Sequence, residues 1–155
     1  MGFKEFVLGR TFIARAIHNS DLIEFSAVLA QKTGITAASF IAIGALKNAK
    51  LGFYDQDKHE YLEILISNPF EIASCIGNIS VKEGAPFIHA HAVLANESGI
   101  TKGGHLLGGK VFAAEVHVTE LVSKEQLVRK ADEITGLSLG AVALISSATL
   151  RSLQQ

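Results

Sequence analysis

The chain has 155 residues, of which 48% are hydrophobic and 19% charged, and its net charge at pH 7 is −1. This length predicts one globular domain with a substantial core, and the near-neutral charge argues against unaided electrostatic attraction to nucleic acid or to an anionic membrane. We expect no secretory signal, and no apolar run reaches the roughly 18–20 residues needed to span a bilayer.

The first part of the chain predicts two strands separated by a helix. Residues 11–17 alternate between apolar and polar side chains, which indicates a strand. Asp21 fits the cap of a following helix, with Glu24 at the capping-box position, and Gly34 is placed to end that helix. Residues 35–46 are apolar on both faces and predict a strand buried on both sides.

From residue 50 onward the pattern predicts antiparallel strands joined by short polar turns. These strands cover residues 50–54, 59–66, 70–81, 87–94 and 110–122. The single cysteine, Cys75, lies in an apolar run and cannot form an internal disulfide, so we expect a buried structural thiol in a reducing, cytoplasmic setting.

The C-terminal part is predicted to be helical. Ser123 followed by Gln126 is a capping-box pattern that indicates a short helix. The tail, residues 138–155, is small and apolar and predicts a helix packed on the body or on a neighbouring subunit. We find no repeat or linker, and therefore predict a single domain over residues 1–155.

Three of the six histidines fall within a short stretch in the second half of the chain. His89 and His91 are two apart, which places both rings on one face of a strand, and His105 follows two glycines. Three histidine nitrogens with a fourth position left open form a common zinc geometry. Histidines buried without a partner would each cost about 1–3 kcal/mol. Ordinary half-buried histidines with satisfied hydrogen bonds remain the alternative, because the spacing is only moderately specific.

A metal at this position would allow activation of water or polarisation of a carbonyl, and both need a nearby acid or base. Glu71 and Glu115 are the candidate catalytic residues, with an exposed or structural role as the alternative for each. Asn78 and Lys102 are candidates for orienting a ligand, and His117, on the same face as Glu115, is a candidate for contact with the metal ligands. Three histidine ligands do not by themselves identify a reaction. Any catalysis would be metal-assisted hydrolysis or decarboxylase-like chemistry.

Three segments together resemble the PPC domain, the plant and prokaryote conserved domain also known as DUF296. They are residues 35–55, 68–99 and 103–121. The similarity as a whole runs over about residues 10–137, which the resemblance implies are the core of the domain. The resemblance implies an α/β fold of the α+β type, with a mixed, largely antiparallel sheet flanked by helices as in acetolactate decarboxylase, and it implies assembly as a homotrimer. It places the family's His-x-His on His89 and His91 and the histidine of its GGHL motif on His105, with zinc as the ion.

Three functions remain open from the sequence. The first is a homotrimeric zinc-binding protein that binds or acts on a small molecule at a site between subunits. The second is a non-catalytic assembly module in DNA-associated regulation. The chain contains no Arg-Gly-Arg-Pro core of the kind that grips A·T-rich DNA, so we do not expect this chain alone to bind nucleic acid. The third is a structural trimer whose histidines bond to one another and to water.

Overall fold

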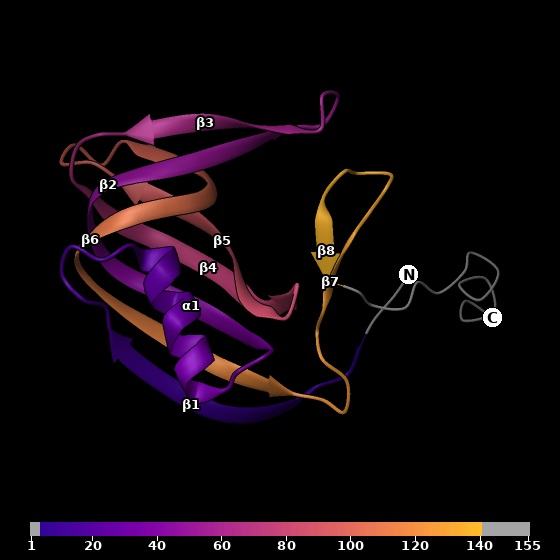
Figure 1. Ribbon diagram of the computed structural model, residues 1–155. Coiled ribbons are helices and arrows are strands. Elements are labelled where there is room, and N and C mark those ends of the chain that lie inside the picture. Colours follow the sequence, from indigo (N-terminus) through magenta and orange to yellow (C-terminus); the bar gives the residue numbers. More distant parts are fainter. Residues whose placement is uncertain (1–3, 141–155) are drawn as a thin grey trace, which may run out of the picture.

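The computed structural model describes residues 4–140 and consists mainly of one antiparallel sheet with a single helix on it (Figure 1). The sheet contains β1 (Val7–Arg15), β2 (Ala38–Asp55), β3 (Glu60–Ile66), β4 (Phe70–Lys82), β5 (Ala85–Ala95) and β6 (Thr101–Val122). The helix is α1 (Leu22–Thr33), and a separate two-stranded sheet is formed by β7 (Arg129–Ala131) and β8 (Ser138–Gly140). The predicted fold class is confirmed, with one flanking helix in the described part of the chain.

The main sheet curls until it closes on itself. Its order is β1-β6-β5-β4-β2-β3, and β2 also pairs with β6. This closure is possible because β6 is 22 residues long: its first part pairs with β5 and the remainder with β2 and β1. Phe40, Ile79 and Val118 are fully buried inside. Cys75 lies in the same core as predicted, and burial raises the pKa of its thiol to about 11.

Helix α1 packs against β5 and β6 and begins and ends as the sequence predicts. Asp21 Oδ1 accepts hydrogen bonds from the backbone N–H groups of Ile23 and Glu24, while its Oδ2 accepts one from Gly109 N at 2.7 Å. Gly34 ends the helix in the left-handed conformation with φ 72°. No helix of residues 4–140 has the length and apolar character required to cross a membrane.

The first strand, predicted at residues 11–17, is observed as β1 at Val7–Arg15, and larger differences concern β2 and β6. The separate strands predicted at residues 35–46 and 50–54 form one continuous strand, β2, with a register irregularity beside Gly44. This glycine has φ 128°, and a Cβ there would lie against the Ala113 carbonyl oxygen, so the irregularity requires glycine. The last predicted strand begins already at Thr101, because the glycine-rich segment is part of β6.

The short helix predicted after Ser123 is wrong. Residues 123–128 form an irregular segment that leads to β7. Their carbonyl oxygens accept hydrogen bonds from other parts of the chain instead of from a helix. Lys4 Nζ donates to the carbonyl oxygens of Glu125 and Gln126, and Val81 N donates to that of Leu127. Of the tail predicted as helix, residues 138–140 form β8 instead. The rest, residues 141–155, lies outside the described residues.

Candidate metal centre

The three histidines come together because of how β5 and β6 pair. His91 and His105 are direct partners in the antiparallel register, and His89 lies on the same face of β5 two residues before His91. Their side chains point away from the core, which takes the alternating residues Ile88, Ala90, Ala92 and Leu94 of β5. One ring nitrogen from each histidine lies within 4.8 Å of the others. The structure therefore brings all three predicted metal ligands to one point.

The geometry of this cluster fits a tetrahedral metal. A zinc ion with bonds of about 2.0–2.1 Å to nitrogen sets its ligands about 3.3 Å apart, and the ring nitrogens here all lie within 4.8 Å of one another. The Nδ1 atom of His105 is buried and has no hydrogen-bond partner in the described part of the chain. Leaving such an atom unsatisfied costs about 1–3 kcal/mol. Coordination of a cation by that nitrogen would remove this cost.

The surroundings of the cluster favour neutral imidazole rings, the form that binds metals. Burial lowers the pKa of His105 to about 4, with smaller contributions in the same direction from His89, His91 and the cation of Arg129. Burial also lowers the pKa of His89, assisted by Arg129 and His91. The lowered pKa values of His89 and His105 therefore favour the form of these two rings that can bind a cation.

A cavity of about 550 Å³ opens beside His89 and His105. The β7–β8 hairpin forms one wall of the cavity, and the hairpin of β2 and β3 contributes Tyr61, whose ring centroid lies 5.1 Å from that of His105. Phe87 and Arg129 also line it. A ligand in this cavity would contact the histidine cluster directly.

Asn78 lies next to the cluster but is already engaged. It is the direct partner of His89 across β4 and β5, and its Oδ1 accepts a hydrogen bond from an Arg129 terminal nitrogen at 3.0 Å. Asn78 therefore orients Arg129. Sequence reasoning missed both Arg129 and Tyr61, since each comes from a segment distant from the histidines and neither lies in a recognisable motif.

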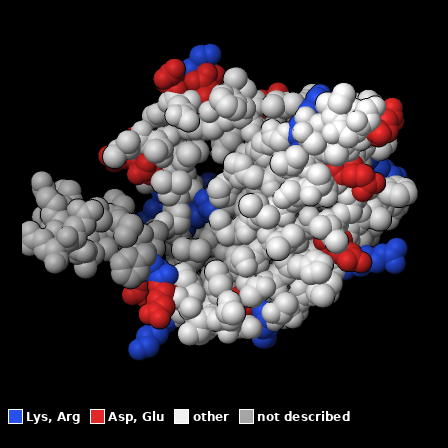
Figure 2. Space-filling view, turned by 180° about the vertical axis from the view of Figure 1, so that it is seen from behind, with Lys and Arg blue, Asp and Glu red and all other residues white. Residues whose placement is uncertain are grey.

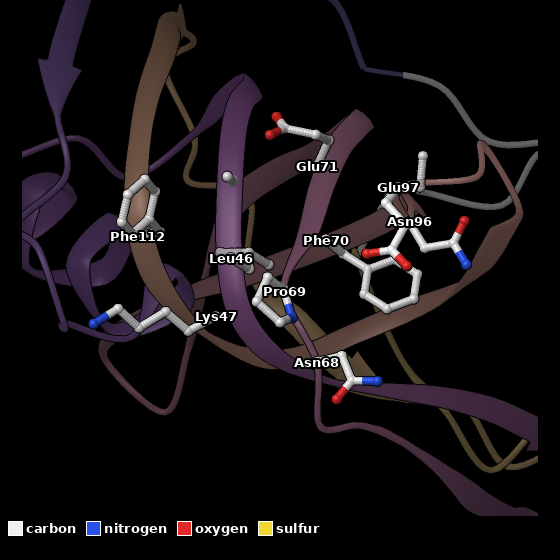
Figure 3. A pocket seen from close by; sticks show the side chains of 11 residues that line it. Leu46, Lys47, Asn68, Pro69, Phe70, Glu71, Asn96, Glu97 and Phe112 are labelled. Carbon is white, nitrogen blue, oxygen red and sulfur yellow. The ribbon is translucent and has the colours of Figure 1, made fainter.

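Glu71 is not part of the cluster. It lies at the start of β4, whereas Asn78 is near the end of that strand, roughly 20 Å away at 3.3 Å per residue. Its carboxylate is exposed and lines a separate pocket of about 610 Å³ together with Phe70 and Phe112 (Figure 3). The lining of that pocket includes none of the three histidines, so the structure does not support Glu71 as an acid or base for them.

The remaining candidates are also distant from the histidines. Glu115 and His117 lie side by side further along β6, with 3.9 Å between Glu115 Oε2 and His117 Nε2. In the register across the sheet, Ile41 of β2 and Ile76 of β4 stand between His117 of β6 and His91 of β5. The two histidines are therefore three strand spacings, or about 14 Å, apart. Lys102 stands three positions before His105 in a regular part of β6 and therefore faces the other side of the sheet. None of the three contacts the cluster.

Comparison with known proteins agrees with the fold. The sequence profile of the Plants and Prokaryotes Conserved (PCC) domain matches residues 3–122. A plant- and prokaryote-conserved (PPC) protein from Pyrococcus horikoshii is 40% identical, with 94% of this chain and 100% of that chain covered and a TM-score of 0.87. A metal-containing protein from Archaeoglobus fulgidus is 41% identical, covering 91% and 99% of the two chains, also with a TM-score of 0.87.

A more distant relative carries a different description. A protein from Ralstonia eutropha JMP134, named as a candidate DNA-binding protein, is 28% identical, with 86% of this chain and 90% of that chain covered and a TM-score of 0.73. No curated protein matches the chain. The profile match over most of the sequence and the similarity to the Pyrococcus protein confirm the resemblance found in the sequence. The chain is a member of the PCC (PPC) domain family.

Proposed function

We propose that this protein binds a zinc ion through His89, His91 and His105 and uses it to bind or act on a small molecule. The observation that carries the proposal is the convergence of three ring nitrogens within 4.8 Å at the edge of a cavity. The Archaeoglobus protein, 41% identical, is described as metal-containing, which supports a metal in this chain. Zinc rather than another divalent ion is favoured by three imidazole ligands with an open fourth position.

The residues around the cluster define what chemistry this site can support. When bound, the ion supplies a Lewis acid at the edge of the cavity. Glu60 and Glu83 are the carboxylates in the lining of this cavity, but they lie at the turns of the β2–β3 and β4–β5 hairpins, away from the histidines, so we assign no acid or base for a hydrolytic or decarboxylase-like reaction. Tyr61 and Phe87 give the cavity aromatic walls that exclude part of the water around a bound ligand.

We further propose that the protein is a homotrimer that associates through the outer face of the main sheet. A row of side chains crosses this face from strand to strand, in which Ile13, Ile41 and Ile76 are 69%, 52% and 60% exposed. His91 is the next residue in the row. Figure 2, the view from behind, shows a broad surface without charged side chains and with Lys, Arg, Asp and Glu gathered mostly at its margins. A second copy covering this face would bring a subunit boundary close to the metal site.

Metal analysis of protein purified without added metal tests the proposal. We expect about one zinc per chain in the wild type and loss of most of it in His89→Ala, because two imidazoles bind zinc much more weakly than three. The matched control is His117→Ala, another histidine on the outer face but outside the cluster. Wild-type protein without stoichiometric metal would overturn the proposal.

The Ralstonia relative favours a second candidate, a module that assembles DNA-associated complexes. Gel-shift titration at low salt separates this function from the first, because electrostatic contacts with phosphate are strongest there. No binding at low salt would eliminate direct DNA contact by this chain. In either case we propose a cytoplasmic protein, which the buried free thiol of Cys75 supports.

A further inference from the structure

The cavity beside the histidines contains an arginine whose charge has no counter-ion in the described chain. Arg129 donates hydrogen bonds to Ser80 Oγ at 2.8 Å, to the Ser138 carbonyl oxygen at 2.6 Å and to Asn78 Oδ1 at 3.0 Å. All three acceptors are neutral. Every Asp and Glu of the sequence lies within residues 4–140, and none of them forms an ion pair with Arg129.

A guanidinium in this setting retains the capacity to bind an anion. Arginine stays protonated in proteins, and its planar group has further N–H donors beyond the three in use here. Burial lowers the pKa of Arg129, which reflects the cost of holding its charge away from water. Its three hydrogen bonds and its stacking on Phe87, with Cζ 4.7 Å from the ring centroid, fix the position of the charge. A fixed, partly desolvated cation binds oxyanions more strongly than a mobile surface side chain.

A second cation lies at the same cavity. Lys82 Nζ is 5.5 Å from the centroid of the Phe87 ring, so both cations contact one aromatic side chain. Lys82 forms no ion pair with any residue between 4 and 140 either. His89 and His105 line the same cavity, as do Arg129 and Lys82. The carboxylates in the lining, Glu60 and Glu83, are exposed and form an ion pair with neither cation. The cavity thus places two unpaired cations and the candidate metal ligands around one space.

We propose that this cavity binds a small organic oxyanion, with the carboxylate or phosphate group held by Arg129 and assisted by Lys82. This inference rests on the proposed function in one respect: the remainder of the ligand would extend to the ion held by the three histidines. The planar guanidinium matches the two oxygens of a carboxylate or of a phosphate. A volume of about 550 Å³ suits a metabolite-sized molecule.

The test uses the full chain stripped of metal, so that the anion cannot bind to zinc itself. The probes are inorganic phosphate and acetate, added at constant ionic strength with chloride as the reference salt. The signal is the ¹⁵N–¹H resonance of each arginine Nε. Arg10 is the internal control, because its guanidinium is already paired with Glu120 at 2.7 Å. We expect a saturable shift for Arg129, none for Arg10, and a lower saturating concentration for whichever oxyanion the cavity prefers.

Two variants check the assignment by calorimetric titration with the same probes. Arg129→Met should weaken binding by about tenfold or more, as expected for loss of a charge-assisted contact, and Lys82→Met should weaken it by a smaller factor. Lys130→Met is the matched control, a neighbouring exposed lysine of β7 outside the cavity lining. If Arg129→Met fails to fold, the wild-type resonance and Lys82→Met still decide the matter.

An Arg129 resonance that moves no more with phosphate or acetate than with chloride would overturn the inference. So would unchanged affinity in a folded Arg129→Met variant. The zinc content is measured in a separate experiment on protein that has not been stripped of metal. Oxyanion binding in a protein that proves to lack zinc would leave this inference standing and remove the proposed function, whereas zinc without oxyanion binding would do the reverse.

Discussion

His91 of β5 lies directly opposite His105 of β6, with ring centroids 5.3 Å apart and ring planes inclined at 77°. His89 completes the group at 5.2 Å from His91 and 5.0 Å from His105. The register of these two strands decides whether the site exists, because a slip by one residue would move one set of rings to the opposite face of the sheet.

Gly77 holds β4 close to the histidine-bearing strand. A Cβ at this position would collide with the His89 carbonyl oxygen and the Phe40 ring. We expect Gly77→Ala to lower the free energy of unfolding by about 1–3 kcal/mol or more and to weaken zinc binding through displacement of His89. Gly103→Ala is the control, because its nearest neighbour would be 3.3 Å away. Chemical denaturation of both variants measures the difference, and equal stabilities would contradict this role for Gly77.

Asp21 links the start of α1 to β6. One carboxylate oxygen caps the helix and the other accepts from Gly109 N. We expect Asp21→Ala to cost about 2–4 kcal/mol, the sum of a lost cap and a lost charged acceptor. Asp21→Asn should cost about half as much, because an amide oxygen can still cap the helix. Denaturant unfolding tests this order. Equal losses in the two variants would show that the helix cap contributes nothing, and an Asp21→Asn variant as stable as the wild type would show that the bond to Gly109 contributes nothing.

The depressed pKa of His105 predicts how stability of the metal-free protein depends on pH. Its folded-state pKa is about 4 and its ordinary value is 6.5, so between these values the unfolded chain binds more protons than the folded one. Stability is therefore highest above pH 6.5 and falls as the pH drops towards 4. We expect the melting temperature to fall between pH 7 and pH 5, and to fall less in His105→Gln. If the melting temperatures of the wild type and His105→Gln fall by the same amount between pH 7 and pH 5, the lowered pKa of His105 is not the cause.

Ile76 tests the proposed trimer. It is 60% exposed at the centre of the outer face, next to His91 in the register. A charge there would be buried on association, so Ile76→Asp should sediment as a monomer while the wild type sediments at three times the chain mass. Ile134→Asp is the control, since Ile134 is 85% exposed in the connection between β7 and β8. A monomeric wild type would refute the trimer.

Local sequence rules were sufficient for the helix and for the paired histidines. Asp21 and Gly34 mark the ends of α1 because capping depends on neighbouring residues. His89 and His91 share a face because strands have a period of two residues. The continuity of β2 through residues 46–50 was not predictable in this way, because pairing with β6 and β3 keeps that segment extended.

The structure places Glu71 and Glu115 apart from the histidines for one physical reason. Glu71 and Glu115 lie on strands that neighbour the histidines, but the position along each strand depends on register and on closure of the sheet, which no single segment encodes. Arg129 was missed because its place beside the histidines also depends on the tertiary fold. It reaches His89 through a hairpin that follows β6, a contact between residues far apart in the sequence.

Diffraction from crystals of untreated protein, with data collected on both sides of the zinc absorption edge, tests the central claim most directly. We predict one anomalous peak per chain, about 2.0–2.1 Å from a ring nitrogen of each of His89, His91 and His105. A map without a peak among these rings, or with the rings hydrogen-bonded to one another and to water, would contradict the assignment of a metal centre.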